Sequence, residues 1–515
     1  MLEPVKEKVP RTVWRRLSTA REAELFGPRG RLPRRGEPDV ARNAALLGLA
    51  GVTVIGLVLR LIVTRGIWLD EAISIHEAHL SFHDMMASLQ VSDRHPPLHY
   101  IVLWGVVRTI GDSEFAVRLP SLIAGTLVIP VLYLLGRDLY DRRTGLIAAA
   151  FGAASPLLIW YAQEARMYAF VTLFGLLAVW TQLRAIRNGR PLDWVAYILA
   201  TSALLWSHYF GLLLIVAQQF IFVGVIVHRR RLREPVGPLA VGFAYAGVVL
   251  ALQLVVLVVF ASEQFRSTGA GEAFGAQPSG RYDSLSFYAV VANMAWALWG
   301  YHPDGTTELL GAMWPLLLLF SLLLLGRGGS RQTVILAVAA AFPLLILVAA
   351  AEYDRQLFEV RYFIVVLPLL FILMARLVTG WLRKPAARYG VAGAFILTML
   401  VGLADQQTND DNPRLFDFRG AIKEVRADAG PKSLVLFEPP DMRFVLDYYA
   451  PELRKRPLRD GKPQRSDGSP VFVLASFQDD PVFFDRTNKV VGQLDFDRKL
   501  VRRFKKSQTL VWEFR

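Results

Sequence analysis

The chain has 515 residues, 53% of them hydrophobic, and a formal net charge of +14. Its apolar residues gather in long blocks that carry few charges, and about 20 such residues span a bilayer core, which excludes a soluble enzyme. The absence of cysteine excludes disulfides, thiolate metal sites and a cysteine nucleophile. No lysine lies between Lys8 and Lys384, and the arginines of that stretch cluster in short loops. This pattern follows the positive-inside rule and argues against a nucleic-acid partner.

The first part of the chain predicts a basic tail followed by a multi-pass membrane domain. Residues 1–42 are polar, rich in arginine and proline, and lack the short apolar segment of a signal peptide. Basic clusters such as Arg137, Arg142 and Arg143 follow every second apolar block. Placing them in the cytoplasm predicts a protein of the cell membrane whose N-terminus is cytoplasmic and whose C-terminus is extracytoplasmic. The eleven predicted spans are 43–64, 116–136, 145–161, 167–183, 193–208, 209–227, 238–261, 308–325, 332–350, 362–380 and 388–404.

Between the first two spans, residues 65–115 form a predicted outer loop with helices that lie along the membrane surface. Segment 98–111 is apolar but too short to cross the hydrocarbon layer, and treating it as a span would place the arginine clusters outside. A second amphipathic segment, from Ile73 to Leu89, precedes it in the same loop.

The remaining residues, 405–515, predict a small extracytoplasmic α/β domain. Apolar residues at Phe418, Ile422 and Val425 have helical spacing, and a Gly430-Pro431 break follows them. Strand-like runs are expected at Ser433–Phe437, Val471–Ala475 and Leu510–Phe514.

Ionisable residues gather at the outer ends of the predicted spans, and this clustering predicts a site. Such residues are costly at a membrane unless they face a cavity or a partner. The alternative is ion pairing between helical neighbours, as for Glu114 with Arg118, which does not explain the bias to one leaflet. The residues are Asp70, Glu71, Asp93, His95, His99, Glu114, Arg118, Glu164, Arg166, His208, Asp354, Glu359 and Arg361.

Six strings around these residues resemble the bacterial GT-C glycosyltransferases, and more narrowly the protein mannosyltransferase-like group that includes the lipid A aminoarabinose transferases. They are WLDEA (68–72), HPPLHY (95–100), FAVRLPS (115–121), SPLLIWYAQEARMYAF (155–170), SHYF (207–210) and RYFIVVLP (361–368). The resemblance covers about residues 43–380. It implies a mainly α, polytopic GT-C fold that transfers one sugar from a polyprenyl phosphate to an acceptor on the outer side of the membrane.

The resemblance also implies roles for the site residues. Asp70 is the expected general base, and Glu71 shapes the site or holds an acceptor or a metal; the alternative is a solvated helix N-terminus. Arginine forks match phosphate oxygens, so Arg118, Arg166 and Arg361 are candidates for the donor phosphate, although one of them could instead anchor a span. His95 is a further phosphate candidate.

Substrate-binding candidates are Tyr161, Glu164, Tyr168, His208 and Tyr362, although interfacial aromatic residues are equally typical of membrane anchors. A divalent metal ion remains open, with Glu71, Glu164, His95 and His208 as candidate ligands. The expected partners are the lipid-linked donor, membrane lipids and a glycan, lipid or protein acceptor. The alternative function is a transporter or flippase of lipid-linked sugars, for which charges near mid-membrane are typical.

Overall fold

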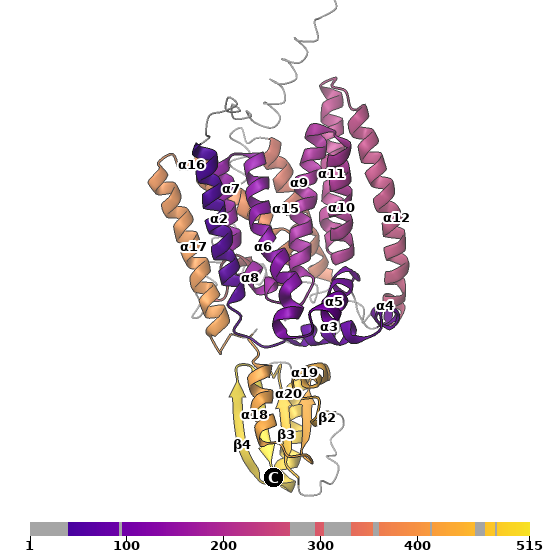
Figure 1. The fold of residues 1–515 in the computed structure, drawn as a ribbon, viewed down its shortest axis with the longest axis vertical. Coiled ribbons are helices and arrows are strands. Elements are labelled where there is room, and N and C mark those ends of the chain that lie inside the picture. The colour runs from indigo at the N-terminus through magenta and orange to yellow at the C-terminus, as the bar shows by residue number, and fades with distance from the viewer. Residues whose placement is uncertain are drawn as a thin grey trace, which may run out of the picture.

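The computed structural model describes residues 40–91, 95–267, 294–302, 331–353, 360–412, 415–458, 469–478 and 481–515. A helical bundle occupies one end of the molecule and a small sheet domain the other (Figure 1). The predicted tail, the block at 308–325 and the candidates Asp93, Asp354 and Glu359 lie outside or largely outside these ranges.

Every predicted apolar block within the described ranges is helical. By length and composition, six helices of the described chain are able to cross a membrane, or seven if one bent pair counts as a single span, so the full set of eleven stays a prediction. The bundle helices are α2 (Val40–Leu61), α6 (Glu114–Leu139), α7 (Arg142–Ala154), α8 (Pro156–Ala162), α9 (Tyr168–Asn188), α10 (Pro191–Ser207), α11 (Gly211–Arg231), α12 (Gly237–Ser267), α15 (Arg331–Tyr353), α16 (Leu367–Trp381) and α17 (Pro385–Thr408).

Two predicted spans are interrupted, and in each a proline lies in the first turn of the helix that follows the break. The block at 145–161 splits into α7 and α8, which meet at 59° where Ser155 caps α8 and Pro156 occupies its first turn. The block at 362–380 begins as a 3₁₀ helix, η2 (Val360–Val365), and Pro368 then stands in the first turn of α16. At the first break, the buried Arg60 guanidinium donates to the carbonyls of Gly152 and Ala153, where a cation suits the helix dipole.

Three short helices lie across the end of the bundle that faces the sheet domain (Figure 1): α3 (Leu69–His79), α4 (Phe82–Val91) and α5 (Leu98–Thr109). The amphipathic segment predicted from Ile73 to Leu89 is divided between two helices, because the chain turns between α3 and α4. Ser81 starts α4 by accepting a hydrogen bond from the backbone of Asp84, at 3.1 Å, and donating to its carboxylate.

The C-terminal domain is the predicted α/β unit, with a sheet in the order β2-β1-β3-β5-β4. Strands β2, β1 and β3 are parallel, whereas β5 runs antiparallel to both β3 and β4. The strands are β1 (Leu434–Glu438), β2 (Arg454–Pro457), β3 (Val471–Ala475), β4 (Leu500–Lys506) and β5 (Thr509–Phe514). Strands β2 and β4 were not predicted, because RKRP and LVRRFKK are too basic to show an apolar face.

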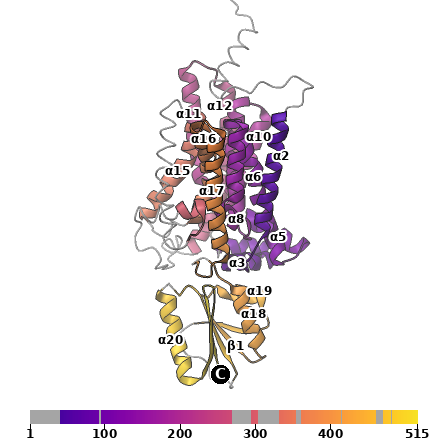
Figure 2. The same cartoon turned by 90° about the vertical axis from the view of Figure 1, so that its left-hand side faces the viewer.

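Helices cover both faces of this sheet (Figure 2): α18 (Phe418–Asp428) and α19 (Met442–Tyr449) on one side, and α20 (Pro481–Asp497) on the other. Alternate residues of β1, β3 and β5 divide between these faces, as Phe472 and Val473 of β3 do. The first face shares its apolar core with Leu69, Ala72 and Ile75 of α3. The C-terminal domain therefore packs directly on the helix that carries the predicted base.

Candidate functional site

Asp70 and Glu71 stand side by side in the first turn of α3 but point to different surroundings. Trp68 is the N-cap residue of the helix, and its backbone N–H donates to Glu71 Oε2 at 2.9 Å. A glutamate at the third helical position is long enough to reach back to this N–H. Successive residues of a helix are rotated by about 100°, so Glu71 turns inward and is fully buried, whereas 33% of the Asp70 side chain is exposed.

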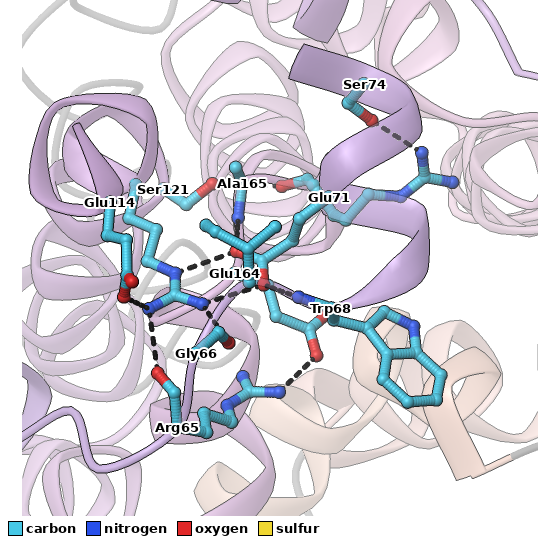
Figure 3. A network of polar contacts seen from close by, with 12 residues as sticks. Arg65, Gly66, Trp68, Glu71, Ser74, Glu114, Ser121, Glu164 and Ala165 are labelled. Carbon is cyan, nitrogen blue, oxygen red and sulfur yellow. Dashed lines mark hydrogen bonds and ion pairs between the residues drawn. The ribbon is translucent and has the colours of Figure 1, made fainter. Parts of the chain in front are cut away.

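Glu71 is the centre of a buried network of polar contacts (Figure 3). Its carboxylate accepts hydrogen bonds from Arg118 Nε and Nη2 and from the backbone N–H of Ala165, all at 2.8 Å. Burial alone would raise the pKa of Glu71, but the charge and hydrogen bonds of Arg118 outweigh it and hold the pKa below its ordinary value. With the cap on Trp68, the two oxygens accept four hydrogen bonds and tie α3 to α6 and to the α8–α9 loop.

The Arg118 guanidinium also binds several groups of the protein. Besides Glu71, it donates to the carbonyl of Gly66 at 2.7 Å and to that of Arg65 at 3.3 Å, and it lies 3.7 Å from Glu114. The pair with Glu114 is the neighbour contact expected from the sequence, but the contact with Glu71 bridges 47 positions of the chain. The guanidinium thus holds the segment that joins α2 to α3.

The loop between α8 and α9 is fixed by a second ion pair. Glu164 accepts from Arg65 at 2.8 Å (Figure 3). The Arg65 guanidinium also stacks 3.7 Å from the centre of the Trp160 ring. Burial raises the pKa of Glu164 despite the charge of Arg65. The next two carbonyls are also held, that of Ala165 by His99 Nε2 at 2.9 Å and that of Arg166 by the Ser121 hydroxyl at 3.0 Å.

Asp70 lies between two of the three predicted phosphate arginines. Its Oδ2 is 3.5 Å from Arg361 Nη1 and 4.0 Å from Arg166 Nη2. Arg166 is buried and anchored by hydrogen bonds to Ser74 Oγ at 2.8 Å and to the Tyr100 hydroxyl at 3.0 Å. The Arg361 side chain is 28% exposed. One accessible carboxylate and two cations therefore meet at one point.

A group of aromatic side chains lies next to Asp70 and the two arginines. Tyr168 lies close enough to interact electrostatically with Asp70, Arg166 and Arg361. Its ring is 4.6 Å from that of Tyr161 and 5.9 Å from that of His208.

His208 connects the rest of this aromatic group. Its ring lies 5.1 Å from His95 and 6.5 Å from Tyr362, and Phe210 lies 4.3 Å from Tyr362. The structure thus brings the predicted substrate-binding aromatic residues together, and it places His95 beside them. Phe210, Ser74 and Tyr100 were not predicted; the only sequence signal was their position in or near the strings SHYF, WLDEA and HPPLHY.

The candidate metal ligands do not form a cluster. Within the described ranges, no group of three or more His, Asp or Glu side chains is arranged to hold a metal ion. Of the four candidates, Glu71 and Glu164 are each paired with an arginine, whereas His95 and His208 face one another.

Comparisons with known proteins agree with the predicted resemblance. The family described as dolichyl-phosphate-mannose-protein mannosyltransferase matches residues 94–260, whereas no curated protein sequence is significantly similar to this chain. The structure of ArnT from Cupriavidus metallidurans bound to undecaprenyl phosphate is 14% identical, covers 92% of this chain and 98% of its own, and has a TM-score of 0.54.

The archaeal oligosaccharyltransferase AglB from Archaeoglobus fulgidus, in complex with an inhibitory peptide and a dolichol-phosphate, is 12% identical. The match covers 92% of this chain and 74% of AglB, with a TM-score of 0.50. These findings confirm the resemblance to the GT-C glycosyltransferases and show that the fold is shared.

Proposed function

We propose that this protein is a membrane glycosyltransferase that moves a single sugar from a polyprenyl-phosphate donor to an acceptor at the outer face of the cell membrane. The observation that carries the proposal is the accessible Asp70 carboxylate between the guanidiniums of Arg166 and Arg361. The lipid phosphates bound by the structurally similar ArnT and AglB support a donor of this class.

This arrangement matches the chemical needs of the transfer. The donor's bond to phosphate breaks with its electrons on the phosphate, which needs positive charge rather than a proton. The acceptor hydroxyl needs a base as its oxygen bonds to the sugar carbon. Glycosidases use two carboxylates to meet both needs. Here Asp70 accepts the hydroxyl proton and the two arginines bind the phosphate. A direct displacement of this kind inverts the anomeric carbon.

The two arginines have different parts in this scheme. Arg166 is fixed by Ser74 and Tyr100, so it offers a preformed position for one phosphate oxygen. Arg361 is more exposed and lies nearer to Asp70. When the donor binds, its phosphate pairs with the Arg361 guanidinium and weakens the contact between Arg361 and Asp70. The Asp70 carboxylate is then free to act as a base. Tyr168, His208 and Tyr362 would contact the sugar or the first part of the lipid chain.

In this proposal Glu71 and Arg118 support the site without contacting the substrate. Each already fills its hydrogen-bonding groups with the other and with the backbone around them. Glu164 has the same supporting part through Arg65, and a metal ion is not assigned to any of the four candidate ligands.

The membrane orientation of the proposal rests on where the charged ends of the helices lie. Helix α6 begins at Glu114, which contacts the C-terminal domain, and about 35 Å further along its axis it carries Arg137 in its last turn. Helices α9 and α11 likewise begin beside site residues and carry arginines in their last turns. Asp70 and the basic clusters are therefore at opposite ends of the bundle, and the positive-inside rule supports the proposal that Asp70 is on the outer side.

The test is to incubate protein in nanodiscs with polyprenyl phosphates carrying radiolabelled mannose, arabinose or glucose, together with a cell-envelope extract as acceptor. Transfer of label to the extract with release of polyprenyl phosphate is expected for one of the sugars, and Asp70→Asn serves as the inactive control. Movement of an intact lipid-linked sugar between leaflets, without cleavage of any donor, would instead identify a transporter.

A further inference from the structure

The segment that leads to Asp70 has little regular structure of its own and is held from two sides. Arg118, from the bundle, donates to the carbonyls of Arg65 and Gly66. From the C-terminal domain, Arg419 Nη2 donates to the carbonyl of Thr64 at 3.1 Å. A carbonyl at each of three successive positions is thus bound by an arginine from a distant part of the chain.

Tyr449 of α19 makes the most direct of these connections. Its hydroxyl accepts from the backbone N–H of Ile67 at 2.7 Å and donates to Glu114 Oε1 at 2.7 Å. Burial raises the pKa of Tyr449, so the hydroxyl keeps the proton that it donates. Glu114 also lies 3.7 Å from Arg118, which binds Glu71. A continuous polar chain therefore runs from the C-terminal domain to the residue next to Asp70.

The C-terminal domain packs closely against the backbone at Gly66. A Cβ added to Gly66 would lie 2.7 Å from Arg419 Cβ and 2.9 Å from the Tyr449 hydroxyl. Glycine is therefore required where the C-terminal domain approaches the backbone.

The apolar contacts at this junction converge on the N-cap of α3. The Trp68 ring lies 4.9 Å from Phe416, 5.9 Å from Phe418 and 5.7 Å from Phe477. Both the cap of α3 and the backbone before it are thus fixed by residues of the C-terminal domain.

We infer that the C-terminal domain is a working part of the catalytic site and that Tyr449 is a positioning residue for Asp70. This inference rests on the proposed transfer at Asp70. Without the Tyr449 hydroxyl, the segment at 64–67 loses one of its backbone anchors and Glu114 loses a donor. The carboxylate of Asp70, three residues beyond Ile67, is then less well placed for the acceptor proton, while the arginines that bind the donor are unchanged.

The test compares Tyr449→Phe with Tyr448→Phe. Both changes remove only a hydroxyl from neighbouring residues of α19, but the Tyr448 hydroxyl donates to the carbonyl of Asp112, which is outside the polar chain. For Tyr449→Phe we expect kcat to fall by about ten- to a hundredfold, with the affinity for sugar-free polyprenyl phosphate retained. Tyr448→Phe should change neither quantity. Equal kcat values for wild type and Tyr449→Phe would overturn the inference.

Hydrogen–deuterium exchange gives a readout that does not require activity. The Ile67 amide should exchange faster in Tyr449→Phe than in wild type or Tyr448→Phe, and unchanged exchange would also contradict the inference. If wild type transfers no sugar, the proposed function fails while the exchange result still decides whether Tyr449 holds the segment. If Tyr449→Phe does not fold, Arg419→Gln replaces it, since this half-exposed side chain anchors the Thr64 carbonyl of the same segment.

Discussion

Replacing Glu71 by glutamine should lower stability far more than the corresponding change of its neighbour, Asp70→Asn. Each Glu71 oxygen accepts from two N–H donors, Oε1 from Arg118 and Ala165 and Oε2 from Arg118 and Trp68. Whichever way the glutamine amide turns, its NH₂ group meets two donors that it cannot satisfy. Arg118 also loses its buried counter-charge. Removing one partner of a buried ion pair typically costs about 3–5 kcal/mol.

This cost is a large fraction of the roughly 5–15 kcal/mol by which a folded protein is stable. The Asp70 carboxylate is 33% exposed, and its nearest guanidinium nitrogen is 3.5 Å away. Pairs that are open to solvent contribute about 1 kcal/mol or less. Asp70→Asn should therefore keep the unfolding midpoint of wild type, while it lowers sugar transfer by about 10²–10⁴-fold through loss of the base.

The assay is thermal unfolding in one detergent, followed by tryptophan fluorescence, alongside the transfer reaction. Glu71→Gln should unfold at a clearly lower temperature than both wild type and Asp70→Asn. A wild-type midpoint for Glu71→Gln, or an equal loss of stability in Asp70→Asn, would contradict a structural role for the buried carboxylate alone. Full transfer activity in Asp70→Asn would remove the base from the mechanism.

Acid dependence of stability gives a second arm of the same experiment. The native pKa of Glu71 lies below its ordinary value of 4.5. A carboxylate with a lowered native pKa stabilises the fold fully above its unfolded pKa, and this contribution is lost as the pH falls through the native value. The difference in midpoint between wild type and Glu71→Gln should therefore be constant above about pH 5 and should shrink in stronger acid. A difference that grows in acid would contradict this assignment of charge.

Three further predictions concern the donor, the membrane and the metal. Arg166→Ala and Arg361→Ala should weaken binding of sugar-free polyprenyl phosphate by about 2–5 kcal/mol, with the lysine variants in between; equal binding of wild type and both alanine variants would remove the phosphate cradle. Alkaline phosphatase should be active when fused after residue 405 and inactive at residue 232, and the reverse result would move Asp70 to the cytoplasm. A chelator should leave transfer unchanged if the arginines alone neutralise the phosphate, whereas loss and recovery with a divalent ion would assign the metal a part.

Much of the fold follows from composition, because a run of apolar residues long enough to cross a bilayer has few alternatives to a helix. The helix breaks are less visible, since the apolar run continues through them. Ser155-Pro156 lies inside one predicted block, and only the capping hydroxyl and the ring of the proline mark a new helix. Ser81 and Asp84 similarly divide what an amphipathic pattern joins.

The sequence predicts which residues form the candidate site, but not which of them are buried supports and which are accessible to a substrate. The sequence places Asp70 and Glu71 together and suggests chemistry for both. Which of two successive helical residues is buried depends on what packs against the helix, and the partners of Glu71 lie at Arg118 and Ala165. Nothing within one helical turn of Glu71 reveals these contacts. Arg118 likewise has an obvious helical neighbour in Glu114, so the sequence does not indicate its closer partner, Glu71.

The contribution of the C-terminal domain follows from the backbone around Asp70. Residues 64–67 lie between α2 and α3, so most of their polar groups lack the partners that a helix supplies. Side chains from elsewhere must bind these groups, and those that do, Arg118, Arg419 and Tyr449, come from both parts of the molecule. The position of Asp70 is therefore not set by the helical bundle alone. A change in the C-terminal domain that never contacts the donor should still alter turnover at Asp70, and the pair Tyr449→Phe and Tyr448→Phe measures that effect.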